Sequence, residues 1–296
     1  MTEIEIVEVG PRDGLQNETA VLDTPVKIEL LNRLADAGAK RIEAVSFAHP
    51  GYVPQMADAE AVMAGLIKRA GVSYIGLVMN ERGYRRAVDT PVDELNFSVS
   101  ATDGFNLANL SANVEDTLGF IEAVAPDVSL PTTATISVVW GCPFDGEVEP
   151  ERVVEIASRL VAAGIDELAL ADTIGVANPW AVRGMIDAVS VVTGSVPLRV
   201  HFHDTRNTGL ANAFAAIESG VRVLDSSVGG LGGCPFAPDA TGNIATNDLV
   251  YMVERAGFMT GFNLTALNEI AHWVGSELSI QPPSLVARAG GFPKSS

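Results

Sequence analysis

Two kinds of hydrophobic pattern alternate along this chain. Short runs of apolar, often β-branched residues are typical of strands buried on both faces, and longer segments with apolar residues every three or four positions are typical of amphipathic helices. The short runs predict eight strands, over residues 4–9, 41–47, 74–79, 94–100, 134–140, 167–171, 198–203 and 223–228. The longer segments predict a helix after each strand, over residues 25–38, 56–69, 81–89, 112–125, 150–163, 179–193, 207–219 and 244–256.

Eight strand–helix units in a row predict an α/β fold, the (β/α)8 TIM barrel, in which parallel strands close into a ring. A further helical segment, residues 264–279, predicts a short C-terminal helical extension. An open doubly wound sheet is the alternative, but it requires a glycine-rich phosphate-binding sequence after the first strand, and residues 10–14 do not match that pattern. Because no linker interrupts the chain, we expect one catalytic domain over residues 1–296, with the barrel at about 3–258 and the extension at about 259–296.

The composition limits the classes of partner. With 47% hydrophobic and 19% charged residues, the chain has ample material for a large core. The net charge of −18 and the lack of a basic run argue against binding to nucleic acid or to an anionic membrane surface. The sequence has no apolar run of membrane-spanning length, and its first residues do not have the features of a signal or transit peptide, so we expect a cytoplasmic protein. An anionic substrate would then bind through a metal ion or a locally placed arginine.

The predicted seventh strand carries two histidines, His201 and His203. Side chains two residues apart on a strand point to the same face, so the two imidazoles project together. Neutral imidazoles in this arrangement can supply half of a divalent-metal site. The alternative is a pair of core histidines satisfied by hydrogen bonds.

Other polar residues are predicted at the same end of the barrel. In such barrels the carboxyl ends of the strands carry the chemistry, so residues that follow different strands meet at one rim. The candidates are Arg12, Asp13 and Gln16 after the first strand, Glu43 in the second, Asp172 after the sixth, and Asn243 at the end of the glycine-rich stretch that follows the eighth. A carboxylate after a strand often caps a helix instead. The convergence of several such groups on one rim favours a functional site.

Asp13, His201, His203 and Asn243 form a mixed oxygen and nitrogen ligand set with one negative charge. Structural zinc sites are closed and usually rich in thiolates, so this set predicts Mg²⁺ or Mn²⁺ with positions open for substrate. We expect Glu43 and Asp172 to lie near enough to orient the ligands. Holding buried water is their alternative role.

Arg12 and a cysteine complete the predicted chemistry. Arg12 would direct a permanent positive charge at an oxygen near the metal, as a developing enolate requires, although a surface ion pair with Asp13 is the alternative. Cys234 lies on a glycine-rich loop whose flexibility lets a thiol reach a substrate and act as acid or base. Cys142, the other cysteine, is the second choice because its surroundings lack such glycines. With two cysteines in 296 residues, a disulfide framework is not expected.

Long motifs of this chain resemble the 3-hydroxy-3-methylglutaryl-CoA lyase family. The first is Glu-Val-Gly-Pro-Arg-Asp-Gly-Leu-Gln-Asn-Glu at residues 8–18. The most specific is Ser-Val-Gly-Gly-Leu-Gly-Gly-Cys-Pro-Phe at residues 227–236, which is similar to that family's loop around its catalytic cysteine. Shorter matches include residues 24–28, 53–56, 141–143, 172–175 and 242–246, so the resemblance runs from about residue 3 to residue 270.

The resemblance implies a metal-dependent barrel lyase that performs a retro-Claisen cleavage of an acyl-CoA thioester bearing a 3-hydroxyl group. It implies metal binding by the four residues already named, enolate stabilisation by Arg12 and proton transfer by Cys234. For 3-hydroxy-3-methylglutaryl-CoA the products would be acetyl-CoA and acetoacetate, as in leucine catabolism and ketone body metabolism. A homo-oligomer is compatible with this interpretation, but the oligomeric state stays open.

Two segments depart from the family pattern. After residues 203–205 the family usually has tyrosine and glycine, whereas this chain has Arg206 and Asn207. Thr19-Ala20 also replaces a pair that often includes lysine. We expect Arg206 and Asn207 to lie near the acyl tail, and Gln16 to contact the substrate.

Other functions remain in view. The same chemistry could act on a longer or branched 3-hydroxyacyl-CoA, or on citramalyl-CoA. A condensing synthase or an aldolase of the same barrel superfamily is a further alternative. A metal-binding scaffold or acyl-CoA sensor without turnover is the non-enzymatic alternative, and it should have lost a ligand, the arginine or the thiol, all of which are present.

Overall fold

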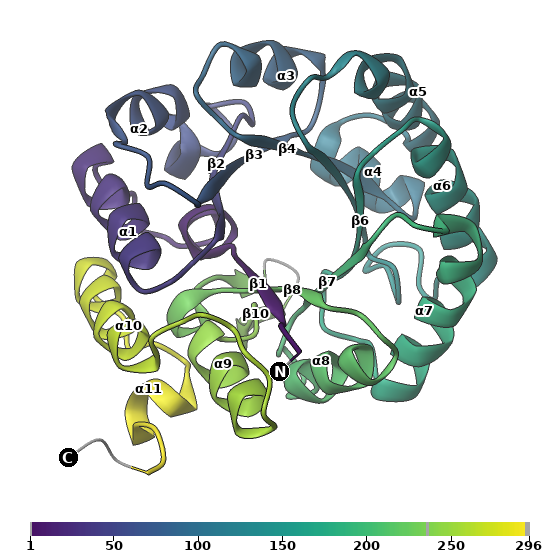
Figure 1. Cartoon of the computed structure of the whole chain (residues 1–296). Helices are drawn as coiled ribbons and strands as arrows, with labels where there is room; N and C mark the ends of the chain where they lie inside the picture. The colour runs from purple at the N-terminus through teal and green to yellow at the C-terminus, as the bar shows by residue number, and fades with distance from the viewer. Residues whose placement is uncertain (1, 235–236, 294–296) are drawn as a thin grey trace.

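Eight parallel strands close into a ring at the centre of the molecule (Figure 1). The computed structural model describes residues 2–234 and 237–293, and for residues 234 and 237–240 it describes the backbone alone. The strands are β1 (Glu5–Glu8), β2 (Arg41–Ser46), β3 (Ser73–Val78), β4 (Glu94–Ser100), β5 (Thr132–Ser137), β6 (Glu167–Asp172), β7 (Leu198–Phe202) and β8 (Val223–Ser226). They pair in chain order, and β8 pairs with β1. The predicted (β/α)8 barrel is confirmed.

Helices surround the ring, one after each strand, because every apolar helix stripe packs on the outer face of the sheet (Figure 1). They are α1 (Thr24–Asp36), α2 (Ala59–Gly65), α3 (Glu81–Val88), α5 (Val114–Val124), α6 (Pro150–Ala162), α7 (Pro179–Thr193), α8 (Gly209–Glu218) and α9 (Thr246–Arg255). The C-terminal extension comprises α10 (Leu264–Leu278) and α11 (Leu285–Ala289), which lie outside the ring beside α9. Among the described residues, none of the helices combines the length and the apolar character that crossing a membrane requires.

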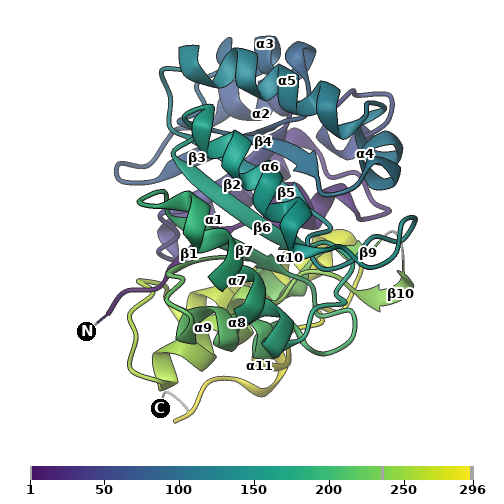
Figure 2. The same ribbon diagram turned by 90° about the vertical axis from the view of Figure 1, so that its right-hand side faces the viewer.

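Three segments differ from the predicted elements. An additional helix, α4 (Asp103–Leu110), follows β4, where its short sequence has only weak helical periodicity and depends on the Thr102 side chain to cap its first turn. The predicted helix 56–69 begins with a short turn at Pro54–Met56 and ends at Gly65. After β8, β9 (Gly233–Cys234) and β10 (Ala237–Thr241) pair as an antiparallel hairpin, whereas we expected an irregular loop. Figure 2 shows α4 and this hairpin towards the same end of the barrel.

Charged side chains fill the N-terminal half of the barrel interior. The guanidinium of Arg41 on β2 forms ion pairs with Glu5, Glu94 and Glu167. One layer higher, the fully buried Arg199 on β7 pairs with Asp225 on β8. Arg41 therefore links β2 with β4 and β6 across the ring, whereas Arg199 links the neighbouring strands β7 and β8.

Candidate active site

A single π-helical turn, η1 (Gly10–Gly14), follows β1 and presents Arg12 and Asp13 to the barrel mouth. The backbone N–H groups of Arg12, Asp13 and Gly14 all donate to the carbonyl oxygen of Val9, at 3.1, 2.7 and 3.2 Å. Pro11 fits the start of this turn because it has no N–H to satisfy there. Isolated π turns recur at functional sites, where they redirect side chains.

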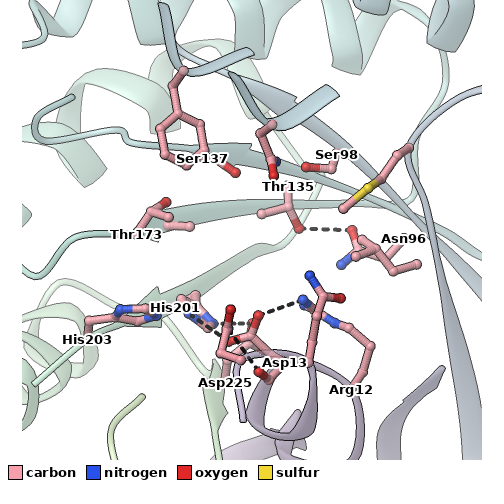
Figure 3. Close-up of a pocket in the computed structure, with 17 residues that line it drawn as sticks. Arg12, Asp13, Asn96, Ser98, Thr135, Ser137, Thr173, His201, His203 and Asp225 are labelled. Carbon is pink, nitrogen blue, oxygen red and sulfur yellow. Dashed lines mark hydrogen bonds and ion pairs between the residues drawn. The ribbon is translucent and has the colours of Figure 1, made fainter. Parts of the chain in front are cut away.

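The structure brings the predicted metal ligands together (Figure 3). Potential ligand atoms of Asp13, His201 and His203 lie within 4.8 Å of one another. Asn243 joins them because its chain segment runs beside the end of β7, where it forms an isolated bridge with His203. Its Nδ2 donates a hydrogen bond of 2.8 Å to Asp13 Oδ2. Four residues from η1, the end of β7 and the segment after the hairpin therefore meet at one point.

The chemistry of this cluster fits a divalent cation. His203 Nδ1 and Asn243 Oδ1 are buried and have no hydrogen-bond partner in the described part of the chain, although buried polar atoms nearly always have one. Burial, and next the charge of His201, lower the pKa of His203 to about 3, so its imidazole is neutral at pH 7. Burial favours a protonated Asp13, but Arg12 and the two histidines outweigh it and hold the pKa of Asp13 well below its usual range. One carboxylate and a neutral imidazole are thus ready to bind metal.

Asp225 orients His201, a role that we did not assign from the sequence. Its Oδ2 lies 3.1 Å from His201 Nδ1, and a carboxylate only accepts hydrogen bonds, so Nδ1 carries the hydrogen and Nε2 is the nitrogen that binds a metal when the imidazole is neutral. Arg199 Nε donates to the other carboxylate oxygen. Burial opposes ionisation of Asp225, but Arg199 and then His201 outweigh it and lower its pKa. The only sequence signal is a carboxylate at an inward-facing position of a strand.

We expect Asp225→Asn to weaken Mn²⁺ binding by about 10- to 100-fold, because the amide no longer requires a hydrogen on His201 Nδ1. Isothermal titration with Mn²⁺ measures the change. Asp204→Asn is the matched control, since Asp204 accepts a hydrogen bond from the Gly209 backbone, which an amide oxygen also accepts. Equal Mn²⁺ affinity of the two variants would contradict the orienting role.

Arg12 is held by a chain of hydrogen bonds inside the barrel, of which Figure 3 shows the links from Arg12 to Asp13 and from Thr135 to Asn96. Its Nε and Nη2 both donate to Glu43 Oε2, and its Nη1 donates to Asp13 Oδ1 at 2.6 Å. Glu43 Oε1 accepts from Asn96 Nδ2 at 2.8 Å, and Asn96 Oδ1 accepts from Thr135 Oγ1 at 2.8 Å. Glu43 therefore orients Arg12, whereas we expected it to orient a metal ligand.

Asp172 stabilises its own loop. Its carboxylate accepts hydrogen bonds from the backbone N–H groups of Val176 and Ala177, at 2.9 and 3.1 Å. Burial raises the pKa of Asp172 to about 6. Among the described residues it makes no hydrogen bond to a predicted metal ligand, so the expected orienting role is not what the geometry favours.

Arg206 and Asn207 lie beside the cavity and do not line it. The exposed Arg206 donates from Nη1 to the carbonyl oxygens of Ile174 and Gly175, at 2.8 and 3.0 Å, so its guanidinium is attached to the loop after β6. Asn207 has a left-handed backbone, with φ +58°, in the turn that leads to α8. Their expected proximity to an acyl tail stays a prediction, and the structure places neither residue in the cavity lining.

A polar wall faces Arg12 and the ligand cluster across the cavity (Figure 3). It consists of short side chains from β4, β5 and the loop after β6, namely Asn96, Ser98, Thr135, Ser137 and Thr173. Gln16 also lines the cavity, and its contact with substrate stays a prediction. Helix α4 supplies Phe105 and Asn109, so the element that the sequence pattern missed forms part of the lining.

The two cysteines differ in place. Cys142 is buried after β5, where its Sγ accepts a hydrogen bond of 3.0 Å from Thr102 Oγ1, and it does not line the cavity. The backbone of Cys234 ends β9, in the hairpin that follows the glycine-rich turn, and its side chain lies outside the described part of the chain. The predicted role of Cys234 therefore rests on its position along the backbone.

Comparisons with known proteins agree with this geometry. Residues 3–274 match the HMGL-like protein family. A mitochondrial hydroxymethylglutaryl-CoA lyase of Macaca fascicularis is 41% identical over 290 residues, which cover 97% of this chain and 89% of that protein. The crystal structure of the HMG-CoA lyase of Bacillus subtilis has a TM-score of 0.95 at 38% identity, with 98% of each chain covered.

A second solved structure is informative about ligands. It is an HMG-CoA lyase from Acinetobacter baumannii in complex with coenzyme A and 3-methylmalate, with a TM-score of 0.95 at 37% identity, and it covers 99% of this chain and 97% of that one. At this coverage the likeness extends over both the ring and the C-terminal extension. This chain therefore belongs to the HMGL-like family, and its near-full-length relatives include hydroxymethylglutaryl-CoA lyases.

Proposed function

We propose that this protein cleaves 3-hydroxy-3-methylglutaryl-CoA into acetyl-CoA and acetoacetate. The observation that carries the proposal is the convergence of Asp13, His201, His203 and Asn243 beside Arg12, facing a polar wall in one cavity. Relatives about 40% identical over nearly the whole chain are named as lyases of this substrate. The relative solved with coenzyme A supports an acyl-CoA thioester as the class of substrate.

Asp13, His201, His203 and Asn243 would hold the cation, and Asp225 keeps His201 in the tautomer that binds metal. The mixed oxygen and nitrogen set without thiolates favours Mg²⁺ or Mn²⁺. When bound, such a cation polarises oxygen atoms of the substrate and lowers the pKa of a hydroxyl group.

The protein's own groups account for the remaining steps. A base, for which Cys234 is the candidate, takes the proton of the C3 hydroxyl, and the C2–C3 bond breaks as C3 becomes the ketone carbon of acetoacetate. The bonding pair passes to the acetyl-CoA fragment as an enolate, whose oxygen receives hydrogen bonds from Arg12. Because Glu43 fixes the guanidinium beforehand, little reorganisation is needed when the charge develops. Protonation at C2 then completes acetyl-CoA.

The wall opposite Arg12 would position the acyl tail. Its amide and hydroxyl groups can donate hydrogen bonds to a carboxylate on the tail. A purely alkyl tail would leave these amide and hydroxyl groups without partners. Gln16 at the rim would contact the thioester end. Arg206 would act on the tail indirectly, by fixing the loop after β6, and Asn207 by shaping the turn that carries Arg206.

The proposal is tested by incubating the purified protein and Mg²⁺ with a panel of 3-hydroxyacyl-CoA thioesters and identifying the products by mass. We expect acetyl-CoA and acetoacetate in equal amounts from the methylglutaryl thioester. Citramalyl-CoA and longer or branched thioesters are the comparison substrates. The second candidate for the substrate is a member of this comparison group. Two observations favour it: the 3-methylmalate bound in the Acinetobacter relative and the altered segment at Arg206. A higher kcat/KM for a comparison substrate would replace the first assignment.

Metal dependence is a separate prediction. We expect chelation to abolish turnover and either Mg²⁺ or Mn²⁺ to restore it, because the ligand set lacks the thiolates that retain zinc. Activity is measured after exhaustive dialysis against chelator and again after each ion is added back. Full turnover in the metal-free protein would contradict the prediction.

The two thiols provide an internal comparison. We expect Cys234→Ser to lower turnover by about 10²-fold or more, since a hydroxyl is a much weaker acid than a thiol and cannot exchange the proton as readily. Cys142→Ser should stay close to wild type, because Cys142 lies outside the cavity and a hydroxyl can also accept the Thr102 hydrogen bond. Steady-state kinetics on both variants checks this, and equal losses would refute the assignment.

A further inference from the structure

The turn between β8 and β9, residues 228–232, is held by side chains of the barrel, and we call it the glycine turn. Glu8 Oε1 accepts a hydrogen bond of 2.9 Å from the Val228 N–H. Asn247 Oδ1 accepts one of 2.8 Å from the Gly229 N–H. On the side of the metal ligands, Asn243 Nδ2 donates to the Leu231 carbonyl oxygen at 3.1 Å. The turn is therefore linked directly to a predicted metal ligand.

The outer side of the glycine turn is covered by the C-terminal extension. The backbone N–H of Ser284 donates a hydrogen bond of 3.0 Å to the Gly229 carbonyl oxygen. Pro282 and Pro283 lie close to the glycines of the turn. A Cβ atom added to Gly229 would lie 3.2 Å from the Cβ of Pro282, and one added to Gly230 would lie 3.3 Å from the Cβ of Pro283. Both glycines have left-handed backbones, with φ of +68° and +76°. The extension therefore packs against the backbone of the turn itself.

Ser284 is fixed in this position. It is 1% exposed, and its Oγ donates a hydrogen bond of 2.7 Å to Asp248 Oδ1 on α9. The same Oγ accepts from the Ala287 N–H and caps α11. Two prolines before it restrict the backbone that delivers its N–H. Residues 282–284 are therefore held in place, and the N–H at their buried end donates to the carbonyl oxygen of Gly229.

The eight strands pair into a closed ring without residues 282–284, so closing the ring does not account for the packing of these residues on the glycine turn. We propose that Pro282, Pro283 and Ser284 form a positioning element for the reaction, which holds the glycine turn from outside. Through the turn they fix the backbone of Cys234 at the start of the hairpin and of Asn243 after it. The proposal rests on the proposed function in assigning Cys234 to proton transfer.

A pair of substitutions at one position isolates the hydrogen bond. Ser284→Ala and Ser284→Pro both remove the hydroxyl, but only proline also removes the N–H that Gly229 requires. The φ of Ser284 is −47°, which a proline ring accepts. We expect Ser284→Pro to have a kcat about 10-fold or more below that of Ser284→Ala, with KM changed less, because small displacements of a reacting group are costly.

Readouts without substrate separate this proposal from the proposed function. In Ser284→Pro, relative to Ser284→Ala, we expect the Gly229–Gly232 amides to exchange hydrogen faster. We also expect the rate of Cys234 alkylation to rise about fivefold. Mass spectrometry of the peptides measures both rates. The overall melting temperatures of the two variants should agree closely. If the wild-type protein fails to cleave the methylglutaryl thioester while these two readouts change, the proposed function fails and the positioning element stands.

Equal kcat, exchange and alkylation in the two Ser284 variants would overturn the proposal. Should Ser284→Pro not fold, Pro283→Gly decides the question, because it removes the contact with Gly230 and leaves every hydrogen-bond donor in place. We expect this variant to show the same faster exchange and alkylation relative to wild type. Unchanged values for Pro283→Gly would overturn the proposal equally.

Discussion

Arg12→Lys is expected to lower kcat by about 10²- to 10³-fold while the protein folds normally and still binds Mn²⁺. Arg12 uses three nitrogen atoms at once, two on Glu43 and one on Asp13. A lysine ammonium can replace one of these contacts but cannot keep the planar group oriented towards the cavity. The charge would remain, and the preorganised direction of its hydrogen bonds would be lost.

Single-turnover kinetics with the methylglutaryl thioester measures this loss directly, and titration with Mn²⁺ shows whether the ligand cluster is intact. Arg222→Lys is the matched control, since Arg222 precedes β8, donates to the backbone carbonyl oxygens of Ile217 and Val221, and does not line the cavity. The control should retain wild-type kinetics. If Arg12→Lys kept most of its activity, the guanidinium would have a structural role and the enolate role would be wrong.

His203→Ala and His201→Ala are expected to weaken Mn²⁺ binding by more than about 100-fold and to abolish turnover, since each removes a predicted ligand. The fold should tolerate His203→Ala well, because the Nδ1 atom of His203 has no hydrogen-bond partner to lose in the described part of the chain. Replacing a buried polar group that lacks a partner costs little free energy of unfolding.

Titration calorimetry with Mn²⁺ and thermal melts of the metal-free variants test both statements. The chain has four histidines, so His49→Ala provides the control: His49 is exposed, its Nδ1 accepts a hydrogen bond from the Gly51 N–H, and it is not part of the ligand cluster. Metal affinity that survived in His203→Ala would remove this residue from the ligand set. A melting temperature that collapsed in the metal-free variant would instead assign His203 to the core.

The fold could be predicted because its signal is repeated eight times. Each strand is a short buried run and each helix has one apolar stripe, so local errors, such as the length of α2, leave the ring unchanged. Helix α4 could not be predicted, since it depends on a side-chain cap and on contacts with the cavity rim more than on its own periodicity. The predicted ligands came together because strand ends in a barrel share one rim.

The residues that orient the site were harder to find. Asp225 and Glu8 are carboxylates within buried strands, and nothing in their neighbours along the chain says which groups face them across the barrel. Glu8 accepts hydrogen bonds from Gly10, Val228 and Thr246, which are separated from it by 2, 220 and 238 residues. Burial raises its pKa to about 7. Such partners become visible only when the ring has closed.

The charged layer at the N-terminal end of the barrel has a consequence for how the chain folds. Arg41 on β2 finds its carboxylate partners on β4 and β6, and Arg199 on β7 finds its partner on β8. Removing one member of a buried ion pair costs about 3–5 kcal/mol, because the other charge stays buried without a partner. A half-barrel cut between β4 and β5 would separate Arg41 from Glu167 and leave that carboxylate to the second fragment. We therefore expect the two halves to be poor folding units alone, and the ring to form in a single cooperative transition.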